Sequence, residues 1–163
     1  MSGTSGVLLE MQICQATTPD QIAAIRALFQ EYAAWLRVDL CFQSFAEELA
    51  SLPGAYAPPQ GRLLLATAPD GPAGCIALRP AGSNSCEMKR LFVRPAYQGQ
   101  GLGRVLAQQI VSDARAIGYS TMVLDTLPFM YGAIHLYTSL GFVPRPAYYD
   151  TPLQETVFME LKL

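Results

Sequence analysis

The chain of 163 residues lacks the features that mark several protein classes. It has one histidine, and its four cysteines form no Cys-x-x-Cys pair, so no zinc cluster of conventional spacing can be assembled. Charged residues make up only 15%, and the net charge of −2 argues against nucleic acid or an anionic membrane as a partner. No apolar run approaches the ~20 residues of a membrane span.

The amino terminus also lacks the basic start and apolar run of a signal peptide. We therefore expect a cytoplasmic protein whose thiols stay reduced, with residues 1–6 as a flexible leader. Apolar residues make up 51%, which is typical of a compact globular protein. A chain of this length forms one domain, and we expect residues 7–163 to be that domain.

Hydrophobic periodicity and turn residues predict both strands and helices. Thr18 and Gln21 form a capping box for the first helix, and Ser44 and Glu47 form a second one. Residues 121–126 follow a helix, so a right-handed crossover makes them parallel to 88–93. These elements predict a mixed α/β fold with a partly antiparallel sheet. The expected strands are 7–15, 62–68, 74–78, 88–93, 121–126, a proline-interrupted strand from 142, and 157–163; the helices are 19–36, 44–51, 102–117 and 129–140, and 53–61 is a loop.

A glycine-rich loop separates the strand 88–93 from the helix 102–117. It reads Gln98-Gly99-Gln100-Gly101-Leu102-Gly103, and an apolar stripe follows it on the helix. A strand, a glycine loop and a helix N-terminus form an anion site, because bare N–H groups converge there. A P-loop would need lysine after the glycines, where Arg104 stands, and the even glycine spacing does not fit a dinucleotide fingerprint. A turn that merely lets strand and helix pack closely is the alternative.

Two motifs together resemble the GNAT superfamily of N-acetyltransferases. The first is Gln98-x-x-Gly101-x-Gly103, and the second is the segment 133–142, which reads Ala-Ile-His-Leu-Tyr-Thr-Ser-Leu-Gly-Phe. The resemblance implies a mostly antiparallel central sheet flanked by helices, with splayed central strands. It also implies acetyl-CoA as cofactor and direct transfer of an acetyl group to a primary amine in a ternary complex. A non-catalytic acyl-CoA-binding sensor or interaction module on the same fold is the alternative.

The same resemblance assigns a cofactor-binding set. The glycine loop would cradle the pyrophosphate, while backbone groups of 91–93 would bind the pantetheine arm and polarise the thioester carbonyl. Arg94 and Arg104 flank the loop and could pair with phosphates; a generic solvated face is the equal alternative. Met130 stands where many relatives carry an asparagine that contacts the cofactor. The cofactor-binding candidates are Leu91, Phe92, Val93, Gln98, Gly99, Gln100, Gly101, Leu102, Gly103 and Arg104.

Three residues are candidates for catalysis. By the resemblance, Tyr137 is the general acid that protonates the departing thiolate; a core-facing helix aromatic is the alternative. Asp125 and Glu87 are rival bases. Strand alternation places Glu87 on the same face as Lys89, Leu91 and Val93, and an ion pair across the sheet is its other interpretation. His135 is expected to be solvated, because it is offset from Tyr137 on the helix.

The acceptor side falls in segments that the motifs do not cover. These segments hold aromatic and acidic residues, which suit a small cationic amine or a peptide N-terminus. Aromatic, proline-rich loops also occur with no substrate. A homodimer is common among relatives, although one complete site per chain is expected. The acceptor-binding candidates are Trp35, Asp39, Phe42, Tyr148 and Tyr149.

Overall fold

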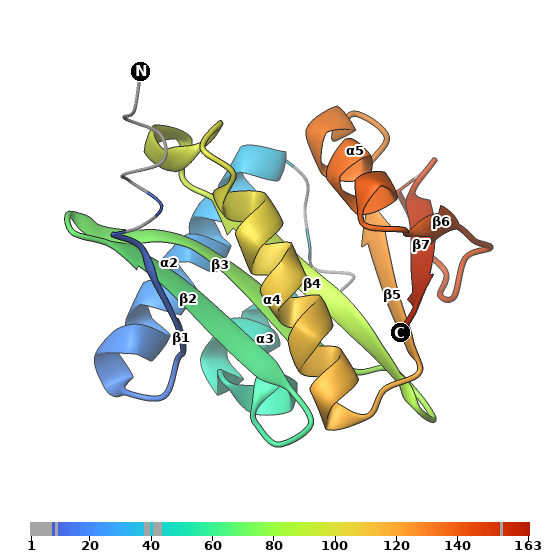
Figure 1. Ribbon diagram of the computed structural model, residues 1–163, viewed down its shortest axis with the longest axis horizontal. Coiled ribbons are helices and arrows are strands. Elements are labelled where there is room, and N and C mark those ends of the chain that lie inside the picture. Colours follow the sequence, from blue (N-terminus) through green and yellow to red (C-terminus); the bar gives the residue numbers. More distant parts are fainter. Residues whose placement is uncertain (1–7, 9, 38–39, 41–43, 154) are drawn as a thin grey trace.

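A computed structural model describes residues 8, 10–37, 40, 44–153 and 155–163 (Figure 1). The described strands form one seven-stranded sheet in the order β1-β2-β3-β4-β5-β7-β6. Every neighbouring pair is antiparallel except β4 and β5, as the sequence predicts. The strands are β1 (Gln12–Gln15), β2 (Arg62–Ala68), β3 (Gly71–Pro80), β4 (Ser85–Val93), β5 (Thr121–Thr126), β6 (Val143–Pro144) and β7 (Val157–Lys162).

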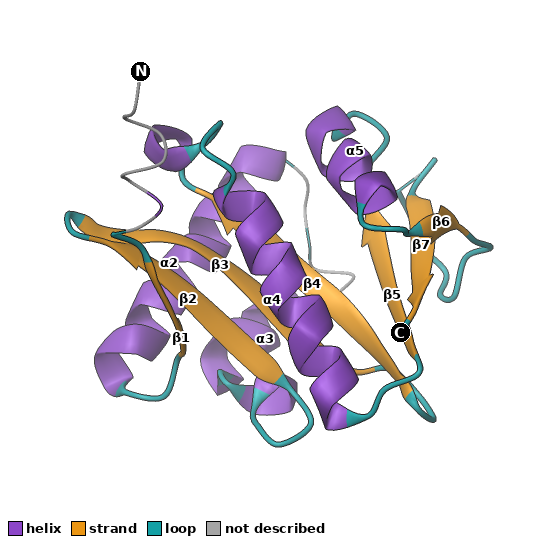
Figure 2. Ribbon diagram, in the orientation of Figure 1, coloured by secondary structure: helices purple, strands orange, loops and turns teal. Residues whose placement is uncertain are grey.

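Helices cover both faces of the sheet (Figure 2). Figure 1 shows α4 (Leu102–Ile117) in front of the sheet, with α2 (Pro19–Leu36) and α3 (Phe45–Ser51) behind it. The apolar stripe of α4 and part of α5 (Tyr131–Ser139) pack into one core, and α2 packs into a second core on the other face. Two 3-10 turns, Gly54–Tyr56 and Pro95–Tyr97, complete the described elements.

Helices α2 and α4 have the predicted bounds, whereas α3 and α5 do not. The capping box of α2 is confirmed, because Thr18 Oγ1 accepts from the Gln21 amide at 3.2 Å and Gln21 Oε1 accepts from the Thr18 amide at 3.1 Å. The second capping box is wrong: Ser44 is left-handed, with φ 56°, and a capping residue needs extended backbone. Helix α5 begins at Tyr131 rather than 129, after a turn closed by a hydrogen bond from the Met130 amide to the Leu127 carbonyl.

Two other segments differ from their predicted extent. The first strand covers only Gln12–Gln15 of the predicted 7–15, because the Met11 amide bonds to the Leu8 carbonyl in a turn. The predicted loop 53–61 contains a 3-10 turn, Gly54–Tyr56. The expected leader, residues 1–6, lies outside the described residues.

The two central strands separate part-way along their length. Strands β4 and β5 pair only from Ser85 with Thr121 to Glu87 with Val123. Beyond Glu87 they diverge, which Figure 1 shows as a widening gap between β4 and β5. In the described part of the chain, residues 88–93 therefore have a strand partner on the β3 side alone. The splayed central strands that the resemblance implies are confirmed.

Strand β4 contains a bulge at Arg90, which has φ 61°. The register against β3 shifts there, between Cys75 and Ala77. The extra residue reverses the side-chain alternation, so Leu91 and Val93 pack on the α4 core, as Met88 does before the bulge. The prediction that Glu87 and Lys89 share a face with Leu91 and Val93 is therefore wrong.

A buried ion pair holds the bulge in place. The Nε and Nη2 atoms of Arg90 donate to the two carboxylate oxygens of Glu48 on α3, each at 3.0 Å. The Arg90 guanidinium also lies 5.1 Å from the Phe45 ring centre. Such two-point pairing fixes the orientation of a guanidinium. The unusual backbone at Arg90 is thus supported from the α2–α3 side of the sheet.

Candidate functional site

A groove of about 320 Å³ runs along the glycine loop. Gly99 and Gly101 have φ of 76° and 87°, which side-chain-bearing residues rarely adopt. Within the described chain, the amides of residues 99–104 donate no hydrogen bond, and they surround the N-terminus of α4. Bare amides at a helix N-terminus fit a phosphate group. The groove is lined by Trp35, Leu91, Phe92, Val93, Tyr97, Gln98, Gly99, Gly101, Leu102, Gly103, Met130, Gly132, Ala133 and Leu136.

Side chains around the loop hold its shape. Gln98 Nε2 donates to the Val93 carbonyl at 2.9 Å, which ties the loop to the end of β4. Arg104 bonds to Ser139 Oγ at 2.8 Å, and it lies beside the groove with Gln100 rather than lining it. Arg94 donates to both carboxylate oxygens of Glu31, so its guanidinium is engaged in an ion pair. Eight of the ten predicted cofactor-binding residues line the groove.

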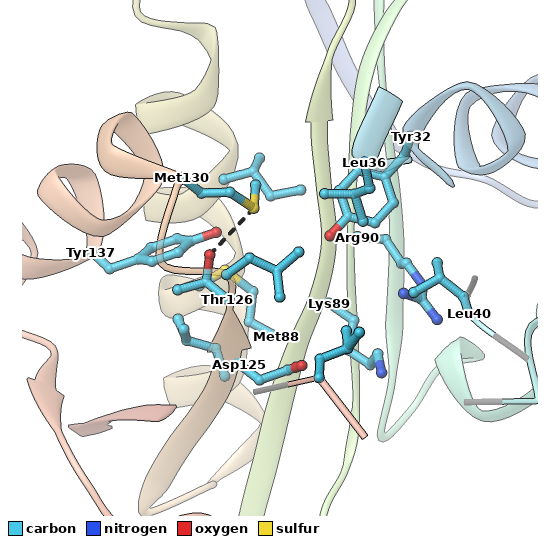
Figure 3. A pocket seen from close by; sticks show the side chains of 14 residues that line it. Tyr32, Leu36, Leu40, Met88, Lys89, Arg90, Asp125, Thr126, Met130 and Tyr137 are labelled. Carbon is cyan, nitrogen blue, oxygen red and sulfur yellow. Dashed lines mark hydrogen bonds between the residues drawn. The ribbon is translucent and has the colours of Figure 1, made fainter. Parts of the chain in front are cut away.

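An inner cavity of about 40 Å³ lies where β4 and β5 separate (Figure 3). The hydroxyls of Tyr137 and Tyr32 point into it from α5 and α2, and Asp125 lies at its lower edge in this view. Thr126 Oγ1 donates to the Met130 sulfur at 3.5 Å across its upper side. The cavity is lined by Tyr32, Leu36, Leu40, Met88, Lys89, Arg90, Leu91, Leu124, Asp125, Thr126, Leu127, Met130, Tyr137 and Leu153.

Tyr137 combines a core position with a polar tip in the cavity. Its ring packs against Phe142, with 5.8 Å between ring centres, and the residue is 7% exposed. Burial raises the pKa of the Tyr137 hydroxyl, and the nearby Tyr32 and Asp125 raise it further. The structure records no hydrogen bond to this hydroxyl from any described residue. The core-facing interpretation therefore describes the Tyr137 ring, while its hydroxyl, which points into the cavity, remains the candidate proton donor.

Both candidate bases contact the tyrosine pair of the segment between β6 and β7. The Tyr148 hydroxyl donates to Glu87 at 2.6 Å, and the Tyr149 hydroxyl donates to Asp125 at 2.7 Å. The two tyrosine rings pack edge to face on each other and on Phe158. Burial raises the pKa of Tyr148, and the charge of Glu87 adds to this shift. The fold thus joins four residues that the sequence analysis named separately.

A wide pocket of about 730 Å³ opens beside this tyrosine–carboxylate cluster. Arg79 on β3 donates through Nε to Glu87 at 2.8 Å. Arg145 stacks on the Tyr148 ring, with 5.4 Å from its guanidinium carbon to the ring centre. The wide pocket is lined by Ala55, Arg79, Pro80, Ala81, Ser85, Glu87, Lys89, Val123, Arg145, Tyr148 and Tyr149.

Lys89 lines both the inner cavity and the wide pocket. It is 8% exposed, and burial together with the neighbouring positive charge of Arg90 lowers its pKa to about 8. Lys89 was not among the predicted site residues, although a lysine inside an otherwise buried strand is a signal of a functional position. Tyr32 was not predicted either, because its position in the sequence fits the apolar face of the amphipathic helix α2.

Other candidates lie apart from the cluster. Trp35 is half exposed and lines the groove rather than the wide pocket. Asp39 and Phe42 lie outside the described residues. His135 is exposed, as expected. The described residues contain no group of three or more potential metal ligands, and none of their helices is long and apolar enough to span a membrane.

Comparison with known proteins places this geometry in a family. The family model described as the GNAT acetyltransferase family matches residues 22–142. An uncharacterised N-acetyltransferase of Schizosaccharomyces pombe is 39% identical over 155 residues, covering 94% of this chain and 95% of that protein. A similar protein of Dictyostelium discoideum is 29% identical, covering 88% and 95%.

Solved structures agree with this assignment. A crystal structure of a putative acyl-CoA N-acyltransferase from Klebsiella pneumoniae has a TM-score of 0.68 at 29% identity and covers 94% of this chain and 96% of its own. An acetyltransferase from Salmonella typhimurium, solved with its cofactor acetyl-CoA, shares the fold, with a TM-score of 0.67 at 22% identity and 94% coverage of each chain. From the family match and the relatives together, this chain belongs to the GNAT family of acetyltransferases.

Proposed function

We propose that the protein transfers the acetyl group of acetyl-CoA directly to a primary amine while both substrates are bound. One observation carries this proposal: the three hollows adjoin one another at shared lining residues. The inner cavity shares Leu91 and Met130 with the groove, and it shares Lys89 with the wide pocket. A donor in the groove and an acceptor in the wide pocket would meet at the inner cavity. Holding two reactants in this way can supply ~7–11 kcal/mol of the barrier reduction.

The groove holds the acetyl donor. Acetyl-CoA is the donor that this family uses, and its thioester supplies the activated acetyl group. The amides of residues 99–104 would bind its pyrophosphate, because they lack acceptors in the described chain and lie at a helix N-terminus. Backbone groups of 88–93 that face away from β3 would bind the extended arm, since β5 has diverged from this edge.

Tyr137 would protonate the departing thiolate. Its hydroxyl points into the inner cavity, and burial raises its pKa, so the proton is available for transfer at neutral pH. Tyr32 faces the same cavity, and burial raises its pKa to about 12. We assign the role to Tyr137 because it lies in the family signature segment, whereas Tyr32 lies on α2.

Asp125 would take the proton from the amine, directly or through a water molecule. It lines the inner cavity together with Tyr137, whereas Glu87 lines only the wide pocket. Glu87 also accepts hydrogen bonds from Arg79 and Tyr148, so we assign it the role of positioning the Tyr148 ring. The hydrogen bond from the Tyr149 hydroxyl orients the Asp125 carboxylate.

Release of free thiol from acetyl-CoA tests the proposal. We expect acetyl-CoA to raise the melting temperature, since a ligand at 100 times its Kd stabilises the folded state by ~2.7 kcal/mol. Across a panel of primary amines, thiol release should require an accepted amine, and the amine should gain one acetyl group. A matched panel of tertiary amines is the control. Thiol release accompanied by acetylation of the protein before the amine is added would contradict direct transfer.

A further inference from the structure

Basic side chains outnumber acidic ones in the lining of the wide pocket. Its charged lining consists of Arg79, Lys89 and Arg145 against Glu87. Glu87 is 4% exposed and accepts from Arg79 at 2.8 Å and from Tyr148 at 2.6 Å. Its charge is therefore neutralised within the protein. A small cationic amine, one of the acceptors that the sequence suggested, finds no unpaired carboxylate among the described residues that line this pocket.

The two arginines keep donors available. Arg79 donates to Glu87 through Nε alone, and its two terminal nitrogens have no partner among the described residues. Arg145 donates through Nε to the Pro146 carbonyl and through Nη1 to Glu160 at 3.2 Å, and its Nη2 has no partner in the described chain. Guanidinium groups with unused donors match the two oxygens of a carboxylate.

The wide pocket adjoins the inner cavity, where the acetyl transfer is proposed to occur. Lys89 lines both hollows, and Tyr149 of the wide pocket bonds to Asp125 of the inner cavity. An acceptor that places its amine at Asp125 therefore extends back toward Arg79 and Arg145. The volume of the wide pocket, about 730 Å³, is within the range of pockets that enclose a small molecule.

We propose that the acceptor is a primary amine that also carries a carboxylate, as an amino acid does, and that Arg79 and Arg145 bind the carboxylate. This inference rests on the proposed acetyl transfer, whose acceptor it specifies. The lowered pKa of Lys89 agrees with this proposal. Burial and the positive charge of Arg90 disfavour the protonated form of Lys89, and a carboxylate bound nearby would offset the positive charge.

Matched pairs of acceptors test the charge requirement. Each pair consists of an amino acid and its amide, which share the amine and the side chain. The amide has the less basic amine, so intrinsic reactivity at neutral pH favours it. We expect kcat/KM for the amino acid to exceed that for the amide by about tenfold or more, since charge-assisted hydrogen bonds are lost with the amide. Equal or reversed preference, or preference for the matched aminophosphonate, would overturn the carboxylate site.

An arginine variant locates the site. Arg145→Gln should raise KM for the amino acid by about tenfold and leave KM for the amide unchanged, with kcat nearly constant. Arg115→Gln is the matched control, because Arg115 is exposed near the end of α4 and outside the pocket. Melting temperatures of both variants identify any loss of folding. A uniform rise in KM for both acceptors would contradict a role in carboxylate binding.

Binding of the N-acetyl amino acid separates failure of the site from failure of the proposed function. Calorimetry should detect this product on the parent protein and detect weaker binding of its amide. Binding of the acid without any turnover would overturn the acetyl-transfer proposal and leave the carboxylate site standing. Absence of binding, or equal binding of acid and amide, would overturn the site whatever the turnover.

Discussion

The groove and the tyrosine–carboxylate cluster lie on neighbouring parts of β4 but are built in different ways. The bare amides and positive-φ glycines of the groove come from one short stretch, residues 91–104, although Trp35 and four residues between 130 and 136 also line it. The cluster depends on side chains far apart in sequence, since Tyr148 and Glu87 are separated by 61 residues. A backbone site leaves a motif in the sequence, because only certain residues permit its conformation. A side-chain cluster leaves none, because any fold that brings the groups together will serve.

The largest expected effect lies at the cavity between the two regions. Tyr137→Phe keeps the ring and its packing on Phe142, so stability should change little. Loss of a general acid lowers kcat by about 10²–10⁴-fold. We expect kcat and kcat/KM to fall together while acetyl-CoA binding is unchanged, as measured by steady-state kinetics and calorimetry.

Tyr131→Phe on the same helix is the control for this experiment, because Tyr131 is 79% exposed. A purely structural tyrosine would give the reverse pattern, with a lower melting temperature and preserved turnover. Full turnover by Tyr137→Phe would end the assignment of this residue as the acid.

The second experiment separates the two carboxylates of the cluster. Asp125→Asn should lower kcat/KM by about 10²-fold or more, because it removes the proposed base from the inner cavity. Glu87→Gln retains an acceptor for the Tyr148 hydroxyl, so a smaller effect is expected, mainly on the acceptor KM. Rate profiles over pH for both variants measure this difference. A larger loss of kcat in Glu87→Gln would transfer the base role to Glu87.

The smallest expected effect tests the backbone region. Gly101→Val places a β-branched residue at φ 87° and obstructs the amides of the groove, so the Kd for acetyl-CoA should rise about tenfold, equal to about 1.4 kcal/mol. Gly118→Val is the matched control, since Gly118 has φ 109° at the other end of α4. Both variants should lose similar stability in thermal melts. Unchanged affinity in Gly101→Val would remove the glycine loop from the cofactor site.

Patterns that arise locally were predictable from the sequence. The Thr18 capping box, the apolar stripe of α4 and the strand–loop–helix order around Gly101 are each decided within about 20 residues. The parallel pairing of β4 and β5 follows from the crossover between them. The signature segment correctly placed Tyr137 on a helix, although that helix is shorter than expected.

The errors arise where tertiary contacts override local pattern. Serine is a favoured N-cap residue, but Ser44 adopts a left-handed backbone and makes no side-chain capping hydrogen bond to a described residue. The bulge at Arg90 is supported by Glu48, 42 residues away, so strand alternation alone could not reveal it. The preference for Asp125 over Glu87 depends on which hollow each carboxylate lines, and this is a property of the assembled sheet.

The bulge at Arg90 also bears on how this protein and its relatives can diverge. Before the bulge, the side chains of Glu87 and Lys89 face the wide pocket; after it, Leu91 and Val93 line the groove. Substitutions at Glu87 and Lys89 would therefore change the proposed acceptor pocket without altering a side chain of the proposed donor groove. Related proteins can in this way use the same acetyl donor while they differ in the acceptor.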